Sequence, residues 1–394
     1  MSVARECRRR GNQRGTLLLR QTAQQQRACG AQSVRGEPCR SFYSQGVTSA
    51  PTRTIWWESA DNDSPVVVID QRRLPHALLH ARWYTVANAA AGIADMTVRG
   101  APLIGVSAAY GMALAARSDT SLGALHRAAD LLAATRPTAV NLRWALERCL
   151  DVARELNDSD REAALRAFAV VLADEDVDQC RRIGAAGLDL IRERAQQAGR
   201  QVQVMTHCNA GRLACIELGT ATSPVYLAHA EGIDVHVWVS ETRPRNQGAA
   251  LTAWELADAG IAHTLVVDNA AGHLLTNGLV DLVIVGADRV AANGDTANKI
   301  GTSLKAYAAA VAGVPFYVAL PWSTFDLGCP DGASIPIEER DEDEVLIVNG
   351  GPVGPPATRA RNWGFDVTPA RFVTGFLTPA GRIAPTDMAA AAPR

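Results

Sequence analysis

The sequence predicts an α/β protein in which a smaller, mostly helical N-terminal domain precedes a Rossmann-like domain built on a parallel sheet. Two observations lead to this fold class. Residues 53–185 carry apolar side chains mainly at helical spacing, whereas from about residue 200 short β-rich runs alternate with helical stretches. Such alternation is typical of parallel strands whose connecting helices cover both faces of a sheet. We therefore expect the helical domain at residues 53–185 and the Rossmann-like domain at residues 186–385.

The composition is that of a globular chain. Hydrophobic residues make up 47% and charged residues 20% of the 394 residues, which suffices for a sizeable buried core. No apolar run approaches the roughly 20 residues that a membrane-spanning helix requires, so no membrane partner is expected.

The first part of the chain differs in charge from the rest. Residues 1–50 hold nine arginines against Glu6 and Glu37, so in a chain of net charge −2 the remainder is acidic. An acidic body does not indicate a nucleic-acid partner. The Arg- and Gln-rich composition predicts a disordered basic extension over residues 1–52. Both an organelle transit peptide and an overlong translation start fit it, and the second is favoured because the arginine bias runs through the whole chain.

The helical region is entered through a short predicted strand, Val66–Asp70. A helix of small residues is predicted over Gly105–Ala116. A further helix is predicted from an apolar stripe whose members are three or four residues apart. They are Leu142, Ala145, Leu146, Cys149, Val152 and Leu156. Cys149 belongs to this stripe and is therefore expected to be a small buried apolar residue.

In the second region the predicted strands are short and rich in β-branched residues. They span Val202–Thr206, Val235–Val239, Thr264–Val267, Leu282–Val285 and Phe316–Leu320. Helices are predicted between them at Gly248–Ala259 and Gly301–Gly313, and Gly313 stands where a glycine commonly ends a helix.

Polar residues follow directly after the predicted strands. Because ligands of open α/β sheets bind at the carboxyl ends of the strands, these residues are the first candidates for a site. They comprise His207-Cys208-Asn209, Glu241–Arg245, Asp268-Asn269, Asp288-Arg289 and Trp322-Ser323. The sequence thus predicts that a thiol, carboxylates and guanidinium groups meet at one edge of the sheet.

The eight cysteines contain no Cys-x-x-Cys pair and no regular spacing, which favours reduced thiols in a reducing compartment such as the cytoplasm. A metal site of His207, Cys208 and Cys215 is disfavoured, because Cys215 is predicted to lie inside the helix after the strand and therefore to pack. The spacing of the two cysteines also differs from that of a thioredoxin-like redox pair.

Cys208 is left as a candidate acid–base group. We expect it at a helix entrance close to Arg243, Arg245 or Lys299, where a thiolate is stabilised. Asp288 ends another strand and supplies a second titratable group. A thiol and a carboxyl on opposite sides of a substrate are suited to moving a proton between adjacent carbons while a leaving oxygen is protonated.

An anionic substrate is indicated by isolated basic residues beside Gly, Pro or a helix start, namely Arg99, Arg136 and Lys299. In an Arg-rich chain a single arginine is more often a solvated surface charge. Arg99 departs from that expectation because Gly100 and Pro102 constrain its loop.

Several segments resemble the methylthioribose-1-phosphate isomerases of methionine salvage, a route of amino-acid biosynthesis, within the initiation factor 2B alpha/beta/delta-like family. The resemblance extends over about residues 55–380. The segments are Asp70–Pro75, Met96–Gly105, Arg136–Leu142, Thr206–Gly211, Glu241–Gly248, Gly286–Arg289, Asn293–Gly301, Ile335–Arg340 and Phe365–Pro369.

The resemblance implies an aldose–ketose isomerase, an intramolecular oxidoreductase that converts 5-methylthioribose 1-phosphate to 5-methylthioribulose 1-phosphate. It places the catalytic roles on Cys208 and Asp288. Substrate binding falls on Arg99, Gly100, Ala101, Arg136, Gln247, Asn298 and Lys299. The resemblance also implies a homodimer that acts on a small sugar phosphate and uses no metal or organic cofactor.

Two other functions fit the same fold. The related ribose-1,5-bisphosphate isomerases need extra cationic contacts at the sugar 5-position, whereas a methylthio group needs an apolar pocket, for which Trp56, Trp57 and Tyr110 are candidates. Regulatory subunits of initiation factor 2B bind partners without catalysis. Such a subunit has no reason to hold Cys208 and Asp288 together, which favours an enzyme.

Overall fold

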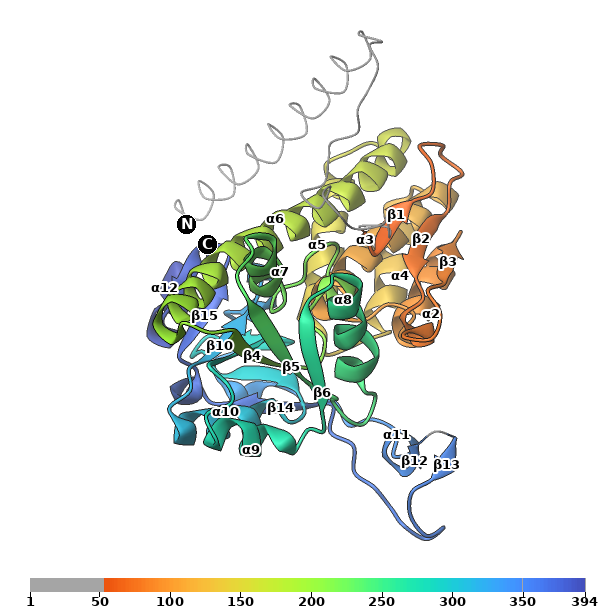
Figure 1. Cartoon of the computed structure of the whole chain (residues 1–394). Coiled ribbons are helices and arrows are strands. Elements are labelled where there is room, and N and C mark those ends of the chain that lie inside the picture. The colour runs from red at the N-terminus through yellow and green to blue at the C-terminus, as the bar shows by residue number, and fades with distance from the viewer. Residues whose placement is uncertain (1–52, 349, 394) are drawn as a thin grey trace. The chain divides into compact units, whose positions relative to one another are not determined.

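The computed structural model describes residues 53–348 and 350–393 (Figure 1). The predicted fold class is confirmed, because a helical N-terminal part with a small sheet is followed by a larger, mostly parallel sheet covered by helices. The predicted basic extension over residues 1–52 lies outside the described residues.

The N-terminal part combines an antiparallel sheet with helices packed around one buried helix. The strands, in the sheet order β1-β2-β3, are β1 (Ile55–Trp57), β2 (Val66–Ile69) and β3 (His80–Trp83). The helices are α2 (Val86–Ala94), α3 (Ala101–Ser118), α4 (Leu122–Ala133) and α5 (Val140–Arg154). Nearly every residue of α3 is buried, and α2, α4 and α5 pack against it.

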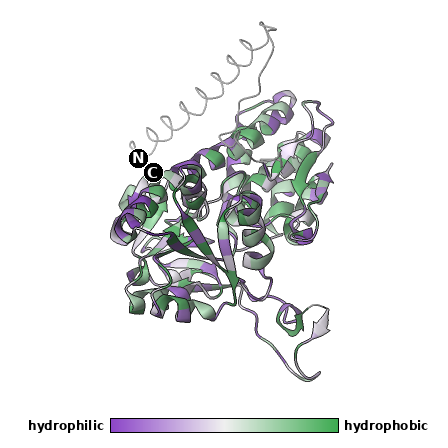
Figure 2. Cartoon of the chain, in the orientation of Figure 1, coloured by the Kyte–Doolittle hydropathy of each residue, from purple (hydrophilic) through white to green (hydrophobic). Residues whose placement is uncertain are grey.

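Two helix predictions in this part are borne out with one correction. The small-residue helix predicted from Gly105 is α3, but it begins at Ala101, directly after Gly100. It starts earlier because Pro102 suits a first helical turn, where its fixed φ fits and its missing N–H is not needed. The first four members of the predicted stripe are buried on α5, and Cys149 is 0% exposed in the helical core. Val152 is only partly buried, and Leu156 lies beyond the end of the helix. The buried residues of α4 and α5 are mostly apolar, and hydrophilic and hydrophobic residues alternate along the helices of the protein (Figure 2).

One long helix, α6 (Asp158–Ala198), belongs to both parts of the chain. Its residues up to Val177 pack in the helical core, and those from Cys180 to Ile191 pack against the larger sheet. The predicted boundary between residues 185 and 186 falls inside this helix. The division into two domains therefore stays a prediction.

The larger sheet of the described residues has seven strands in the order β16-β15-β10-β7-β4-β5-β6. Neighbouring strands are parallel except for β16, which is antiparallel to β15. The strands are β4 (Val202–His207), β5 (Val235–Ser240), β6 (Ala262–Val266), β7 (Leu282–Val285), β10 (Phe316–Ala319), β15 (Gly375–Thr378) and β16 (Gly381–Ile383). All strands predicted from residue 200 onward are found, although β6 begins two residues earlier than Thr264.

Helices cover both faces of this sheet (Figure 1). One face packs against α6, α7 (Ser223–Ala230) and α8 (Ala253–Asp258), and the other against α9 (Ala270–Thr276) and α10 (Thr302–Ala312). Along β4, Val202 and Val204 enter the first core and Met205 enters the second. The predicted helix from Gly248 is α8 preceded by a π-helical turn, and the second predicted helix, α10, ends at Gly313.

A smaller sheet lies beside the carboxyl ends of the main strands. Its order is β11-β8-β9-β14, with β11 (Phe325–Asp326), β8 (Arg289–Ala291), β9 (Thr296–Lys299) and β14 (Phe365–Thr368). Between β11 and β14 the chain projects from the body as α11 (Asp343–Leu346), β12 (Ile347–Val348) and β13 (Gly351–Pro352) (Figure 1). The short helix α12 (Met388–Ala391) follows β16. Among the described residues no helix is both long and apolar enough to span a membrane.

Gly187 allows α6 to approach α7 closely, and its replacement tests this packing. A methyl group at residue 187 would lie 2.4 Å from Cγ of Pro224 and 3.0 Å from Cδ1 of Leu377, and the proline ring cannot rotate away. We expect Gly187→Ala to lower the free energy of unfolding by about 1–3 kcal/mol, measured by urea denaturation.

The matched control is Gly272→Ala on α9, where no atom lies within 4 Å of the added methyl group. In a helix this change leaves stability unchanged or raises it by about 0.5–1 kcal/mol. Equal effects of the two substitutions would contradict the packing argument.

Candidate active site

The candidate site lies where two neighbouring parallel strands end. The chain crosses from β4 to β5 on one side and from β7 to β10 on the other, and α/β sheets bind ligands in the crevice at such a reversal. One cleft here holds about 680 Å³ of empty space including its mouth, which suits one small ligand. All of the predicted site residues line it. They are Cys208, Asp288, Arg99, Gly100, Ala101, Arg136, Gln247, Asn298 and Lys299.

Cys208 follows β4 in a backbone conformation that is uncommon for a residue with a side chain. Its φ is 64°, a left-handed value that costs on the order of 1–3 kcal/mol and persists only where the surroundings impose it. Its N–H donates to Oγ1 of Thr242 at 2.8 Å, and its carbonyl accepts from Oγ1 of Thr252 at 2.7 Å. These bonds from two different segments fix the direction of the thiol.

The prediction of a helix entrance at Cys208 is wrong. Gly211 and Gly219 pair in an antiparallel bridge, so the chain after β4 closes into a loop with only a 3-10 turn, Arg212–Ala214. The next helix, α7, begins at Ser223. For the same reason Cys215 does not lie inside a helix, although it is buried as expected.

Burial raises the pKa of the Cys208 thiol, Arg99 and Lys299 lower it, and Asp288 raises it. The predicted stabilisation of a thiolate is therefore outweighed by loss of hydration. Of the cations expected nearby, Lys299 is confirmed, whereas the guanidinium groups of Arg243 and Arg245 bind residues of α11. The protonated thiol is the favoured form at neutral pH.

The pKa of the Asp288 carboxyl group is raised as well. Burial raises its pKa, while Lys299, Arg136 and Arg99 lower it and Glu338 raises it. Burial is the largest of these effects, so the acid keeps its proton to a higher pH than an exposed aspartate. The cleft thus contains two groups whose neutral forms can each donate a proton.

Arg99 is a buried side chain and not a surface charge. It is 8% exposed, and Nη2 donates to the backbone oxygen of Asn209 at 3.0 Å and to its side-chain Oδ1 at 2.7 Å. The adjacent Gly100 has φ 96°, and a methyl group there would lie 2.5 Å from Cα of Ala214. Only glycine permits this approach, which brings the start of α3 against the loop after Cys208.

The remaining polar groups come from three other segments. Arg136 pairs with Glu338 at 3.2 Å, and its Nε is buried with no hydrogen-bond partner among the described residues. The Oε1 atom of Gln247, just before the π-helical turn, is likewise unpartnered. Lys299 on β9 lies 4.7 Å from the ring centroid of Phe365, and burial lowers its pKa. The unpartnered atoms leave hydrogen-bonding capacity for a ligand.

The aromatic residues expected to form an apolar pocket lie elsewhere. Trp57 and Tyr110 pack against each other in the N-terminal part with tilted rings, and Trp56 packs beside Leu213. None of the three lines the cleft. Apolar walls come instead from smaller residues and one aromatic ring. These residues are Met96, Pro102, Ala210, Ala214, Ala287, Pro321 and Phe365.

Comparison with known proteins identifies the family of the chain. The Initiation factor 2 subunit family matches residues 97–385. A methylthioribose-1-phosphate isomerase of Methylorubrum extorquens is 52% identical over 345 residues, which cover 85% of this chain and 94% of that protein.

The chain belongs to the methylthioribose-1-phosphate isomerases of this family. A crystal structure of 5-methylthioribose 1-phosphate isomerase from Pyrococcus horikoshii is 38% identical with a TM-score of 0.77, covering 86% of this chain and 94% of that one. The translation initiation factor eIF-2B subunit delta from A. fulgidus is also 38% identical with a TM-score of 0.73, covering 85% and 97%. The resemblance read from the sequence motifs is confirmed.

In this member of the methylthioribose-1-phosphate isomerases, Glu255 organises the loop behind the cleft, a role that the sequence analysis missed. Its carboxylate is 1% exposed and accepts from the N–H groups of Arg212 and Leu213, from Asn209 Nδ2 and from the hydroxyl of Tyr226. The one available signal was a glutamate within the mostly apolar helix predicted from Gly248.

We expect Glu255→Gln to destabilise the protein by about 2–4 kcal/mol in urea denaturation, because an amide turns an N–H group toward buried donors. Glu147→Gln, at an exposed position on α5, is the control and should change stability by less than about 0.5 kcal/mol. A Glu255 variant as stable as the control would show that the carboxylate does not hold the loop.

Proposed function

We propose that the protein converts 5-methylthioribose 1-phosphate to 5-methylthioribulose 1-phosphate in methionine salvage. The observation that carries this proposal is the meeting of the Cys208 thiol and the Asp288 carboxyl in one cleft with basic side chains. The names of the relatives support it, since the Methylorubrum extorquens protein is a methylthioribose-1-phosphate isomerase.

Asp288 is proposed to open the sugar ring. A phosphate on the anomeric carbon prevents the spontaneous ring opening that free aldoses undergo, so the ring oxygen must be protonated as its bond to C1 breaks. Because burial raises the pKa of Asp288, this carboxyl retains the proton that the step requires.

Cys208 is proposed to act at the carbons beside the phosphate. After ring opening, one hydrogen moves from C2 to C1 and the C2 hydroxyl loses its proton, which leaves a ketone at C2 and the phosphate on C1. The thiol is held by two backbone hydrogen bonds, so it presents a fixed acid–base group at this point. Both a proton shift and a hydride shift give the same product.

The phosphate is proposed to bind among Arg99, Arg136 and Lys299. The first N–H groups of α3, at Ala101 and beyond, point from a helix N-terminus that favours anions. The unpartnered Nε of Arg136 is a ready donor for a phosphate oxygen. The unpartnered Oε1 of Gln247 suits a sugar hydroxyl, because that atom can only accept.

The oligomeric state and the location of the enzyme are proposed from its exposed apolar side chains and its free cysteines. Large apolar side chains are exposed on α10 and along the edge strand β6 and its end, which supports a homodimer. They are Leu304 (65%), Val311 (83%), Leu265 (48%) and Val267 (60%). The cysteines of the described residues are all free thiols, which supports a cytoplasmic location.

The substrate can be tested directly with the purified protein. We expect conversion of 5-methylthioribose 1-phosphate to its ketose, followed by the phosphorus NMR signals of the two sugars. Ribose 1,5-bisphosphate is the competing substrate, and turnover of this sugar alone would assign the related bisphosphate isomerase activity. Activity with neither sugar would favour the partner-binding role suggested by the likeness to the initiation factor subunit.

Two substitutions separate the catalytic groups. Cys208→Ser keeps a polar group of similar size but removes an ionisable one, and Asp288→Asn keeps hydrogen bonding but removes the proton. Each should lower kcat by roughly a hundredfold or more while the fold is retained. Cys149→Ser is the control, because it changes a thiol that is buried on α5 and does not line the cleft. Near-normal turnover by either cleft variant would remove that residue from the mechanism.

The pH dependence follows from the sign of the Asp288 shift. The protonated carboxyl is the active form, so kcat should fall as pH rises through the raised pKa of Asp288. Removing the charge of Glu338 lowers that pKa, and Glu338→Gln should therefore move the alkaline decline to lower pH. An unchanged or opposite movement would contradict Asp288 as the acid.

A further inference from the structure

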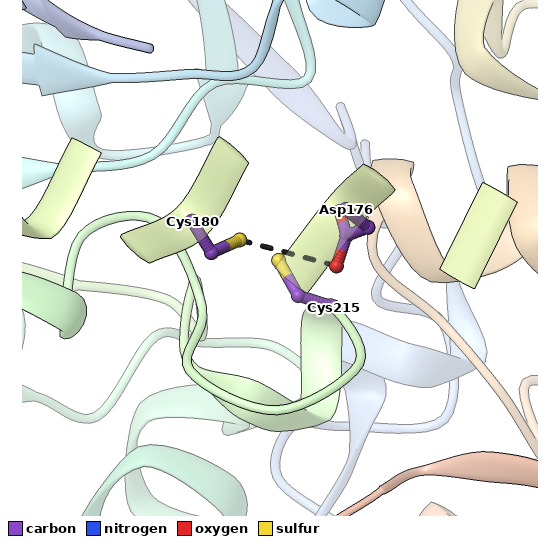
Figure 3. Close-up of side chains that lie close together, drawn as sticks. All are labelled: Asp176, Cys180 and Cys215. Carbon is purple, nitrogen blue, oxygen red and sulfur yellow. Dashed lines mark hydrogen bonds between the residues drawn. The ribbon is translucent and has the colours of Figure 1, made fainter. Parts of the chain in front are cut away.

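Three metal-ligating side chains outside the proposed catalytic set converge beside the cleft (Figure 3). Asp176 and Cys180 are four residues apart on α6 and so face the same side of the helix. Cys215 reaches them from the loop after β4. One ligand atom from each lies within 4.8 Å of the other two, and all three residues are buried. In the described residues this is the one such group.

Asp176 has no cationic partner among the described residues. Its Oδ2 atom accepts from the backbone N–H of Ile216 at 3.0 Å and from the thiol of Cys180 at 3.9 Å, and it forms no ion pair with lysine or arginine. A carboxylate is costly to bury without a partner, and coordination to a metal ion is one way in which proteins hold such a group.

We propose that Asp176, Cys180 and Cys215 bind a thiophilic divalent cation of the zinc type. Two sulfurs and one carboxylate oxygen are ligands that zinc takes, whereas calcium and magnesium require oxygen atoms. On binding, both thiols release their protons to solvent and two metal–sulfur bonds form, so the two thiolates neutralise the charge of the cation and the carboxylate supplies the third ligand atom. Ligand atoms of a tetrahedral zinc ion are roughly 3.5–3.8 Å apart, so small side-chain rotations close the site.

The surroundings hold the two cysteines in place. The hydroxyl of Ser223 donates to the carbonyl of Cys180 at 2.8 Å, and that of Thr54 donates to the carbonyl of Cys215 at 2.6 Å. These contacts fix the backbone on both sides of the site without occupying a ligand atom.

The position of the site gives the bound ion a structural role. Cys180 packs in the core of the larger sheet, whereas Ile216, next to Cys215, packs in the helical core. The ion would therefore join α6 to the loop that lines the cleft at the junction of the two cores. The proposal is independent of the isomerase reaction, because neither Cys208 nor Asp288 is a ligand.

The test measures metal content of the full-length protein after dialysis against zinc and then against buffer. We expect about one zinc ion per chain bound by this site, determined by elemental analysis. Cys180→Ser and Cys215→Ser should each lose that equivalent, and Asp176→Asn should weaken binding at least tenfold. Cys149→Ser is the matched control, because its thiol is also fully buried but has no carboxylate beside it, and it should keep the ion.

A second measurement remains decisive where a variant fails to fold. Cobalt replaces zinc at thiolate sites and gives a sulfur-to-cobalt absorption band, which we expect in Cys208→Ser protein, where the catalytic thiol cannot contribute. Chelation should lower the thermal midpoint of the wild-type protein, and zinc should restore it. Zinc content unaffected by the three ligand substitutions, no cobalt band together with an unchanged midpoint, or an intact mass that reveals a Cys180–Cys215 disulfide would each overturn the proposal.

Discussion

The parallel pairing of β4 with β7 is the constraint on which the site depends. The chain leaves these two adjacent strands in opposite directions across the sheet, so no connection fills the space above their carboxyl ends. Cys208 and Asp288 emerge there although they are distant in sequence. The start of α3 and the end of β9 then bring Arg99 and Lys299 to the same opening. Main-chain topology, more than any single side-chain contact, assembles the chemical groups.

Loss of hydration dominates the electrostatics of this opening. It raises the pKa of both Cys208 and Asp288 and lowers that of Lys299, so each group is pushed toward its neutral form. Attraction between the oppositely charged forms of these groups shifts the pKa values the other way, but by less. An incoming phosphate adds negative charge, which strengthens the hold on protons at the thiol and the carboxyl while favouring charged lysine. The protonation states of these side chains therefore depend on the charge of the bound ligand.

The regular part of the fold could be predicted from sequence because it follows from local rules. Alternating β-rich and helical runs located five of the seven strands of the main sheet but not β15 and β16, and residues after the predicted strands gave Cys208 and Asp288. The loop from Gly211 to Gly219 could not be predicted, since its shape comes from a bridge between two glycines. That loop explains why the helix expected around Cys215 is absent there.

The electrostatic environment of the site could not be predicted from the sequence either. A stabilised thiolate was expected from nearby positive residues, but the balance depends on burial, which only the packed structure defines. The role of Glu255 depends equally on four donors from segments distant from it in sequence. Interactions between neighbours in sequence were accessible, whereas those created by the meeting of remote segments were not.

The length of α6 has a consequence for how the protein denatures. A helix of 41 residues gives one portion to each hydrophobic core, and its turns support each other through successive backbone hydrogen bonds. If either core opened alone, half of this helix would lose its apolar cover while the other half remained docked. Such partly unfolded species are therefore disfavoured, and the two halves are coupled into one cooperative transition. We therefore expect amide protons along the middle of α6 to exchange with solvent through global opening.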